Sequence, residues 1–190
     1  MNSKTVLIAF LLAGTSPLFG QDVIAPPPRL DSTQTAVRDA LYRLRDSLQL
    51  VDAASSRLAR DRARSSDDVL SSRARRLATN CAAAAKAVEP TRKAVTSAGL
   101  PLKDPRSVRQ ALLHSLDSLA VGLKYCAAEF HRLQAPELAA ELRDYGIRRG
   151  EKVQSYIRRH DAAVGPYFET VTGSRYEASR RGAGTIAAPH

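Results

Sequence analysis

The sequence predicts an all-α fold: an up-down-up-down antiparallel four-helix bundle with a flexible N-terminal spacer and a C-terminal tail. Three observations lead to this prediction. Apolar residues recur every three or four positions from residue 31 to residue 165, which gives each helix one apolar stripe. Glycine, proline and capping residues interrupt the pattern at three places. No stretch alternates between polar and apolar residues as a half-buried strand would.

The first predicted helix begins at Asp31, because Asp31 and Gln34 have the spacing of a capping box. Its apolar stripe covers residues 37–58. A polar, arginine-rich run then shifts the phase of the stripe, and Ser65 with Asp68 resembles a second capping box. We place the first turn there. The alternative is a first helix that continues through residue 65, which would give a three-helix arrangement.

The second and third predicted helices carry apolar stripes over residues 70–95 and 112–133. Gly99 suits the C-terminal cap of the second helix, and Asp104 before Pro105 suits the start of the third. Pro90 lies inside the second helix and should kink or split it, because proline lacks the backbone N–H that a helix needs.

The fourth predicted helix starts at Pro136 and continues the stripe through Leu142 and Tyr145. The stripe weakens towards residue 164, and Gly165-Pro166 ends it. The bundle is therefore predicted to cover residues 31–165. Residues 166–190 are predicted to be a mostly disordered tail, because their C-terminal part consists largely of glycine, serine, arginine and alanine.

The antiparallel register follows from the positions of the stripes. In a helical hairpin, residues that face each other are equally distant from the turn. Apolar positions of neighbouring stripes pair about midpoints at residues 64–65, 103–104 and 135–136, where the turn signals also lie. Cys81 and Cys126 pair in this way across the second and third helices. We therefore predict a disulfide between them that joins these two helices.

The first twenty residues have the layout of a secretory signal peptide. Lys4 supplies the positive charge, residues 6–13 form an apolar run, and Gly20 offers a cleavage site before Gln21. The run is shorter than the ~20 residues of a membrane-spanning helix, although an uncleaved anchor remains an alternative. Residues 21–30 form a proline-rich spacer. We expect a periplasmic or secreted protein, and an oxidising compartment would favour the disulfide.

The chain is strongly basic, with 29 Lys and Arg residues against 19 Asp and Glu residues and a formal charge of +10. Loss of residues 1–20 would remove one lysine and no acid, which leaves +9. Solvated helix faces explain many of these arginines, since aspartates are interleaved with them. The rest suggest contact with an anionic partner. The anion-binding candidates are Arg57, Arg60, Arg62, Arg64, Arg73, Arg75, Arg76, Arg148 and Arg149.

Gly146 and Gly150 form a Gly-x-x-x-Gly pattern in the fourth predicted helix. Each glycine costs roughly 1 kcal/mol of helix stability, so a close approach of another element should offset it. Because the apolar stripe is weakest in this helix, we interpret these glycines as a docking face or a loosely packed edge.

The sequence carries no motif of a catalytic site, and we expect a protein that is not an enzyme and has no cofactor. It lacks the nucleophile elbow of hydrolases and the Cys-x-x-Cys-His pattern of covalent haem. His114 and His160 could approach each other at one end of the bundle, which leaves a metal or haem carrier as a distant third hypothesis.

We expect an exported helical bundle that binds another component of the cell envelope, as an adaptor, accessory subunit or chaperone. The alternative is a basic protein that binds polyanions or membrane headgroups. An envelope protein is the expected partner, and anionic lipid or polysaccharide is the alternative. Nucleic acid is disfavoured by the compartment, and no aromatic residues are interleaved with the arginines in sequence.

Overall fold

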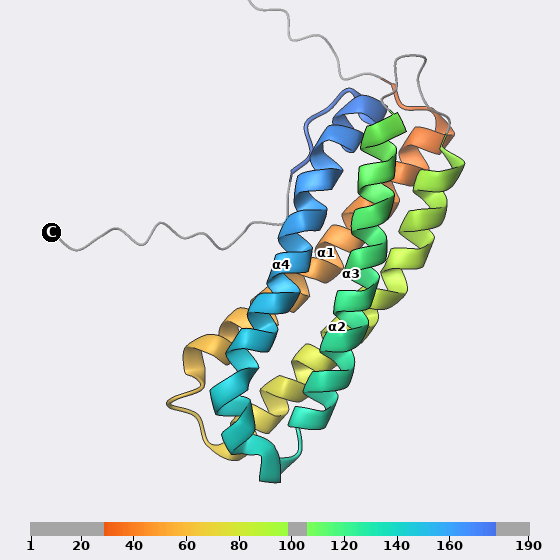
Figure 1. Cartoon of the computed structure of the whole chain (residues 1–190). Helices are drawn as coiled ribbons and strands as arrows, with labels where there is room; N and C mark the ends of the chain where they lie inside the picture. The colour runs from red at the N-terminus through yellow and green to blue at the C-terminus, as the bar shows by residue number, and fades with distance from the viewer. Residues whose placement is uncertain (1–28, 99–105, 178–190) are drawn as a thin grey trace, which may run out of the picture.

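The computed structural model of the chain describes residues 29–98 and 106–177. They form four helices, α1 (Ser32–Asp61), α2 (Asp67–Ser97), α3 (Arg106–Leu133) and α4 (Ala139–Thr172), with a short 3₁₀ helix, η1 (Pro136–Leu138), before α4. Each helix runs antiparallel to the one before it, and this part of the chain contains no strand (Figure 1). The predicted four-helix bundle is confirmed, and α1 ends before the position where a three-helix arrangement would require it to continue.

Several sequence-based expectations fall on residues outside the described ranges. They concern the signal segment, most of the spacer, the cap signals at Gly99 and Asp104, and residues 178–190.

The start of α1 is fixed by the predicted capping box. The Gln34 backbone N–H donates to Asp31 Oδ1 at 2.7 Å, and the Asp31 backbone N–H donates to Gln34 Oε1 at 2.9 Å. The Gln34 side-chain amide also donates to the Val171 carbonyl at 2.9 Å. The box therefore caps α1 and joins its first turn to the last turn of α4.

The start of α2 differs from its prediction. Its N-cap is Ser66, whose side chain makes no capping hydrogen bond, and the predicted box of Ser65 and Asp68 does not form. Ser65 Oγ instead accepts a hydrogen bond from the Arg73 guanidinium at 3.2 Å. Pro90 does not split α2, which is continuous from Asp67 to Ser97. Burial of Val88, Thr91 and Val95 around it stabilises the helix there despite the missing donor.

The core contains the predicted stripes of the first three helices almost unchanged. Their leucines and valines are fully or nearly fully buried, as are Thr91 and the two cysteines. Phe130, Tyr167 and Phe168 are the largest fully buried side chains. Leucine therefore supplies most of the interior, as the low aromatic content of 5% indicates.

The interior face of α4 differs from the predicted stripe. Tyr145 is exposed, and Arg149 lies at the surface in an ion pair. The positions that face the core are instead Gly146, Gly150 and His160, with Val153 and Ile157 between them. The stripe was correct at Leu142, Val153, Ile157 and Val164, which are buried, and wrong at Tyr145 and Arg149. Glycine and histidine do not count as apolar, so these two positions were assigned to the larger neighbours of Gly146 and Gly150.

The bundle also extends beyond the predicted boundary at residue 165. α4 continues through Pro166 to Thr172 and ends at Gly173, which has a positive φ of 66°. Tyr167, Phe168 and Val171 are buried, and the chain then folds back so that Tyr176 stacks on Tyr42 at 5.8 Å. The expectation of a tail from residue 166 was wrong for residues 166–177, since four apolar residues there anchor them.

A disulfide joins Cys81 of α2 to Cys126 of α3, as predicted, with the two Cα atoms 5.9 Å apart. The helices therefore meet in the register that the stripes indicated. Gly122 of α3 takes no part in this approach, because it faces α4, where the ring of Tyr156 covers it. Among the described helices, none is long and apolar enough to span a membrane.

Candidate functional site

The predicted arginine clusters meet at one end of the bundle. The α1–α2 turn and the α3–α4 turn lie side by side there, at the lower end of the view (Figure 1). Segments 57–76 and 129–149, which flank these turns, carry eleven arginines and seven carboxylates. We call this region the basic end. It contains all nine anion-binding candidates that the sequence indicated.

Some arginines of the basic end hold the turns together. Arg73 forms an ion pair with Asp61 at 2.7 Å across the α1–α2 turn. Arg143 of α4 donates to the carbonyls of Arg62 and Ser65 at 2.6 and 3.0 Å and forms an ion pair with Asp67. Its guanidinium therefore caps exposed carbonyls of the turn and attaches it to α4.

Arg75 and Arg149 also have partners within the fold. Arg75 donates to Gln134 Oε1 at 3.1 Å. Arg149 forms ion pairs with Glu129 and Glu141, and Arg132 bridges the same two carboxylates at 2.8 and 2.6 Å. The hydrogen bond from Arg132 lowers the pKa of the Glu141 carboxyl, which favours the ionised form that the ion pair requires.

Six of the nine candidates remain available for a ligand. They are exposed, and among the described residues no carboxylate forms an ion pair with their guanidinium groups. We call them the free arginines. They are Arg57, Arg60, Arg62, Arg64, Arg76 and Arg148.

Two shallow hollows at the basic end are lined by free arginines. The first, about 290 Å³, lies between α1 and α2 and is lined by Arg57 and Arg76 with Arg73. The second, about 540 Å³, lies between the α1–α2 turn and α4, where Arg62, Arg143 and Arg148 line it. Guanidinium groups bind carboxylates, phosphates and sulfates by paired hydrogen bonds, so each hollow presents two free arginines to an anion, Arg57 with Arg76 in the first and Arg62 with Arg148 in the second. Asp144 also lines the second hollow.

The two glycines that were interpreted as a docking face lie inside the bundle instead. Gly146 and Gly150 are both buried on the interior side of α4. A Cβ atom at Gly150 would lie 2.6 Å from Ser55 Oγ, and one at Gly146 would lie 4.0 Å from a methyl carbon of Leu58. Gly150 therefore allows α4 to approach α1 closely, and neither glycine is exposed for docking of a partner.

The two histidines that were considered for a metal or haem differ in exposure to solvent. His114 is exposed on α3, whereas His160 is buried and its Nδ1 lies 3.2 Å from Ser115 Oγ. Burial lowers the pKa of His160 to about 4, so its ring is neutral at physiological pH. The described residues contain no group of three or more His, Cys, Asp or Glu side chains that could hold a metal ion.

Sequence reasoning missed the tyrosines that lie beside cations on α3 and α4. Lys152 Nζ lies 4.8 Å from the centre of the Tyr125 ring, and the Arg159 guanidinium lies 4.7 Å from that of Tyr156. Lys152 and Tyr125 are far apart in sequence, so only the register of α3 against α4 brings them together. Tyr156 and Arg159 are three residues apart, which was a readable signal for a helix face.

Comparison with known proteins gives no assignment for this site. The chain matches no protein-family model, and no curated protein or solved structure shows significant similarity to it.

Proposed function

We propose that this chain is an exported, non-enzymatic binding protein whose basic end holds an anionic component of the cell envelope. The observation that carries the proposal is the gathering of six free arginines around two adjoining turns. Like charges placed together without carboxylate partners destabilise a fold slightly, and an anionic ligand offsets that cost.

Between the two expected kinds of partner, the geometry favours the anion over an envelope protein. The glycine face that suggested a protein partner is an internal contact between α1 and α4. The arginines, in contrast, are exposed and line open hollows. The ligand groups that suit them are phosphate, sulfate or carboxylate, as found on anionic lipids and acidic polysaccharides.

Export is part of the proposal. It is supported by the signal-peptide layout of residues 1–20 and by the Cys81–Cys126 disulfide, since disulfides persist mainly in oxidising compartments.

The test compares two triple variants that remove the same charge. Arg57→Gln, Arg60→Gln and Arg64→Gln remove three free arginines from the basic end. Lys86→Gln, Lys93→Gln and Arg158→Gln remove three exposed cations from other surfaces. Binding to anionic vesicles and to dextran sulfate is measured at several salt concentrations.

At about 1 kcal/mol for each contacting cation, the first variant should bind on the order of a hundredfold more weakly at low salt. The second variant should lose much less. Affinity of the unchanged protein should fall steeply with salt, because exposed charges are screened over ~8 Å at physiological ionic strength. Equal losses in both variants would assign binding to net charge alone and contradict a site at the basic end.

A further inference from the structure

A second surface feature lies along the outer side of α3 and α4. It is composed of aromatic, aliphatic and cationic side chains, and we call it the aromatic–cationic face. Its members are Val121, Tyr125, Tyr145, Lys152, Tyr156 and Arg159.

The face exposes apolar surface that the bundle does not use. Val121 is 65% exposed, Tyr145 is 49% exposed and Tyr125 is 39% exposed. These are three of the five large apolar side chains that are strongly exposed among the described residues. Val121 and Tyr125 are four residues apart and therefore adjacent on α3. Adjoining exposed apolar residues mark an interaction site more often than apolar residues scattered singly.

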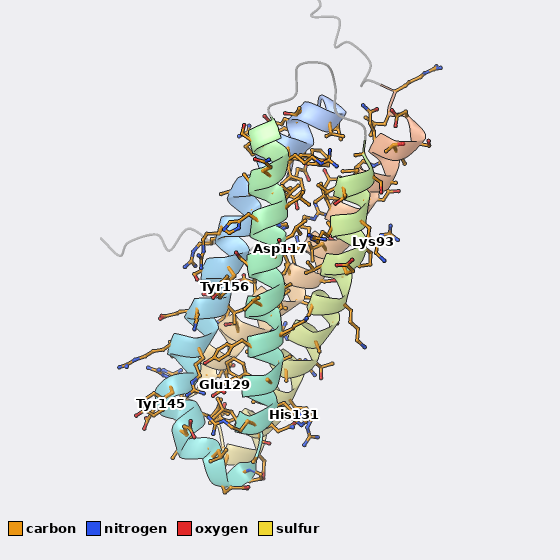
Figure 2. All side chains as sticks on the ribbon, turned by 45° about the vertical axis from the view of Figure 1, so that its right-hand side comes forward. Lys93, Asp117, Glu129, His131, Tyr145 and Tyr156 are labelled. Atoms are coloured by element: carbon orange, nitrogen blue, oxygen red, sulfur yellow. A yellow bond between two sulfur atoms is a disulfide. The ribbon has the colours of Figure 1, made fainter. Side chains whose placement is uncertain are left out.

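Helical geometry makes the α4 part of the face continuous. Tyr145, Lys152, Tyr156 and Arg159 follow one another at intervals of seven, four and three residues, so they lie on one side of the helix. Figure 2 shows Tyr145 and Tyr156 along the same stretch of α4. From Tyr145 to Arg159 the face extends about 21 Å along the helix axis.

Contacts between side chains hold the rings in place. The Tyr156 ring lies on Gly122 of α3, so closely that a Cβ atom there would be 2.4 Å from Tyr156 Cδ2. Arg159 lies against the Tyr156 ring, and Lys152 lies against the Tyr125 ring. Tyr125 and Tyr156 are therefore held at the surface by these contacts, each with a cation beside its ring.

Glu129 and Glu141, two carboxylates beside this face, are already neutralised by arginines. Glu129, which Figure 2 shows between α3 and α4, is bound by Arg132 and Arg149, and so is Glu141. The positive charge of Lys152 and Arg159 is not matched by an ion pair among the described residues. The face therefore joins apolar surface to net positive charge.

We infer that the aromatic–cationic face lies flat on an anionic lipid bilayer, with its tyrosines and Val121 at the level of the headgroups. This inference rests on the proposed function and names the anionic component. Tyrosine is enriched at bilayer interfaces, where its ring is buried and its hydroxyl remains wet. Lysine and arginine beside it contact lipid phosphates. An exposed valine gains free energy in a bilayer interface and gains little on a hydrated polysaccharide, which decides between the two anions.

The basic end continues this face towards the turns. Tyr145 and the free arginine Arg148 both line the second hollow, so the two surfaces meet there. A bilayer that contacts the face would also reach the arginines of this hollow.

The experiment uses tryptophan as a reporter, because the chain contains none. Val121→Trp and Tyr145→Trp each place a single tryptophan on the face. Leu50→Trp is the control, since Leu50 is 61% exposed on α1, which does not contribute to the face. Each oxidised variant is titrated with vesicles of phosphatidylglycerol and phosphatidylcholine, with and without brominated acyl chains, and separately with dextran sulfate.

The expected result is a blue shift and quenching by brominated lipid for Val121→Trp and Tyr145→Trp, with neither change for Leu50→Trp. The double variant Lys152→Gln and Arg159→Gln should bind these vesicles about thirtyfold more weakly, and Lys86→Gln with Lys93→Gln should not. Lys93 projects from α2, away from α4 (Figure 2).

Three outcomes would overturn the inference. If all three tryptophans behave alike while the vesicles still bind, the basic end binds anions but this face does not contact lipid. If dextran sulfate shifts the reporters and vesicles do not, the face recognises a polysaccharide. If neither ligand binds at low salt, the proposed function fails as well.

Discussion

Gly150 of α4 lies directly against Ser55 of α1, so that a Cβ atom at position 150 would lie 2.6 Å from the serine hydroxyl oxygen. Both residues are buried. The absence of a side chain at Gly150 therefore lets α4 pack against α1.

Gly150→Ala should destabilise the protein by about 1–3 kcal/mol, because the added methyl group overpacks a buried contact. Adding Ser55→Ala should restore most of this loss. It removes the hydroxyl oxygen and leaves the serine Cβ at 3.9 Å, an ordinary contact distance. Urea unfolding of the two single variants and the double variant measures the coupling. Additive effects would show that the two residues do not meet.

Reduction of the Cys81–Cys126 disulfide should lower the free energy of unfolding by about 4 kcal/mol, as the chain-entropy model gives for two cysteines 45 residues apart. Urea unfolding with and without reductant measures the loss. The variant with Cys81→Ala and Cys126→Ala is the control, and reductant should not affect it. Two free thiols in the natively produced protein would contradict the disulfide.

Buried His160 should make the protein less stable in mild acid. Its pKa is about 4 in the folded protein and near 6.5 when unfolded, so the unfolded chain binds the proton first. The full stability is present above pH 6.5 and is lost as the pH falls from 6.5 towards 4, by roughly 3 kcal/mol in all.

The control for this prediction is His160→Gln, which keeps a polar side chain near Ser115 and cannot titrate. Other groups titrate alike in both proteins, so the difference between the two stability profiles isolates His160. Parallel profiles between pH 6.5 and 4 would show that His160 is accessible to protons in the folded state.

Tyr176 should stabilise the bundle although it lies beyond the last helix. Its ring stacks on Tyr42 and contacts Phe168 at 5.2 Å, and Arg45 donates to the Glu177 carbonyl at 3.3 Å. Termination after Gly173 should cost roughly 3 kcal/mol, as truncation of a large buried aromatic residue does. Termination after Glu177 should leave the melting temperature unchanged. Equal melting temperatures for the two shortened chains would show that the residues after α4 do not stabilise the domain.

The signal segment should be cleaved near Gly20–Gln21 when the protein is exported. The positive charge at Lys4 and the short apolar run of residues 6–13 lead to this expectation. N-terminal sequencing of the protein from its native host identifies the first residue. An intact Met1 in a membrane fraction would favour the uncleaved anchor instead.

The parts of the fold that could be predicted depend on large apolar side chains. Leucines and valines at helical spacing defined α1, α2 and α3, and the position of Cys126 opposite Cys81 followed from that spacing alone. α4 was harder, since it buries Gly146, Gly150 and His160, which a search for apolar residues passes over. The last turns of α4 were not predicted, because Gly165-Pro166 was interpreted as the end of the helix. The helix instead continues through Pro166 to Thr172 and tolerates the missing proline N–H.

The candidate site could be predicted only as a set of arginines. Which of them remain available depends on partners far away in sequence. Arg143 reaches Asp67 across 76 positions, and Arg149 reaches Glu129 on a neighbouring helix. These pairs depend on the rotation of each helix about its own axis. The sequence indicates that rotation only through the apolar residues that face the core. For the same reason the contact between Lys152 and Tyr125 could not be predicted from the sequence.

The disulfide lies between the two helices that are central in the chain, α2 and α3, and its consequence concerns cleavage of the backbone. A protease that cuts the connection between residues 99 and 105 would leave two helical hairpins, each with one cysteine. The covalent bond would keep the two pieces in one molecule, at a high effective concentration relative to each other. A nicked chain could therefore refold without a bimolecular search, and only combined cleavage and reduction would separate its halves.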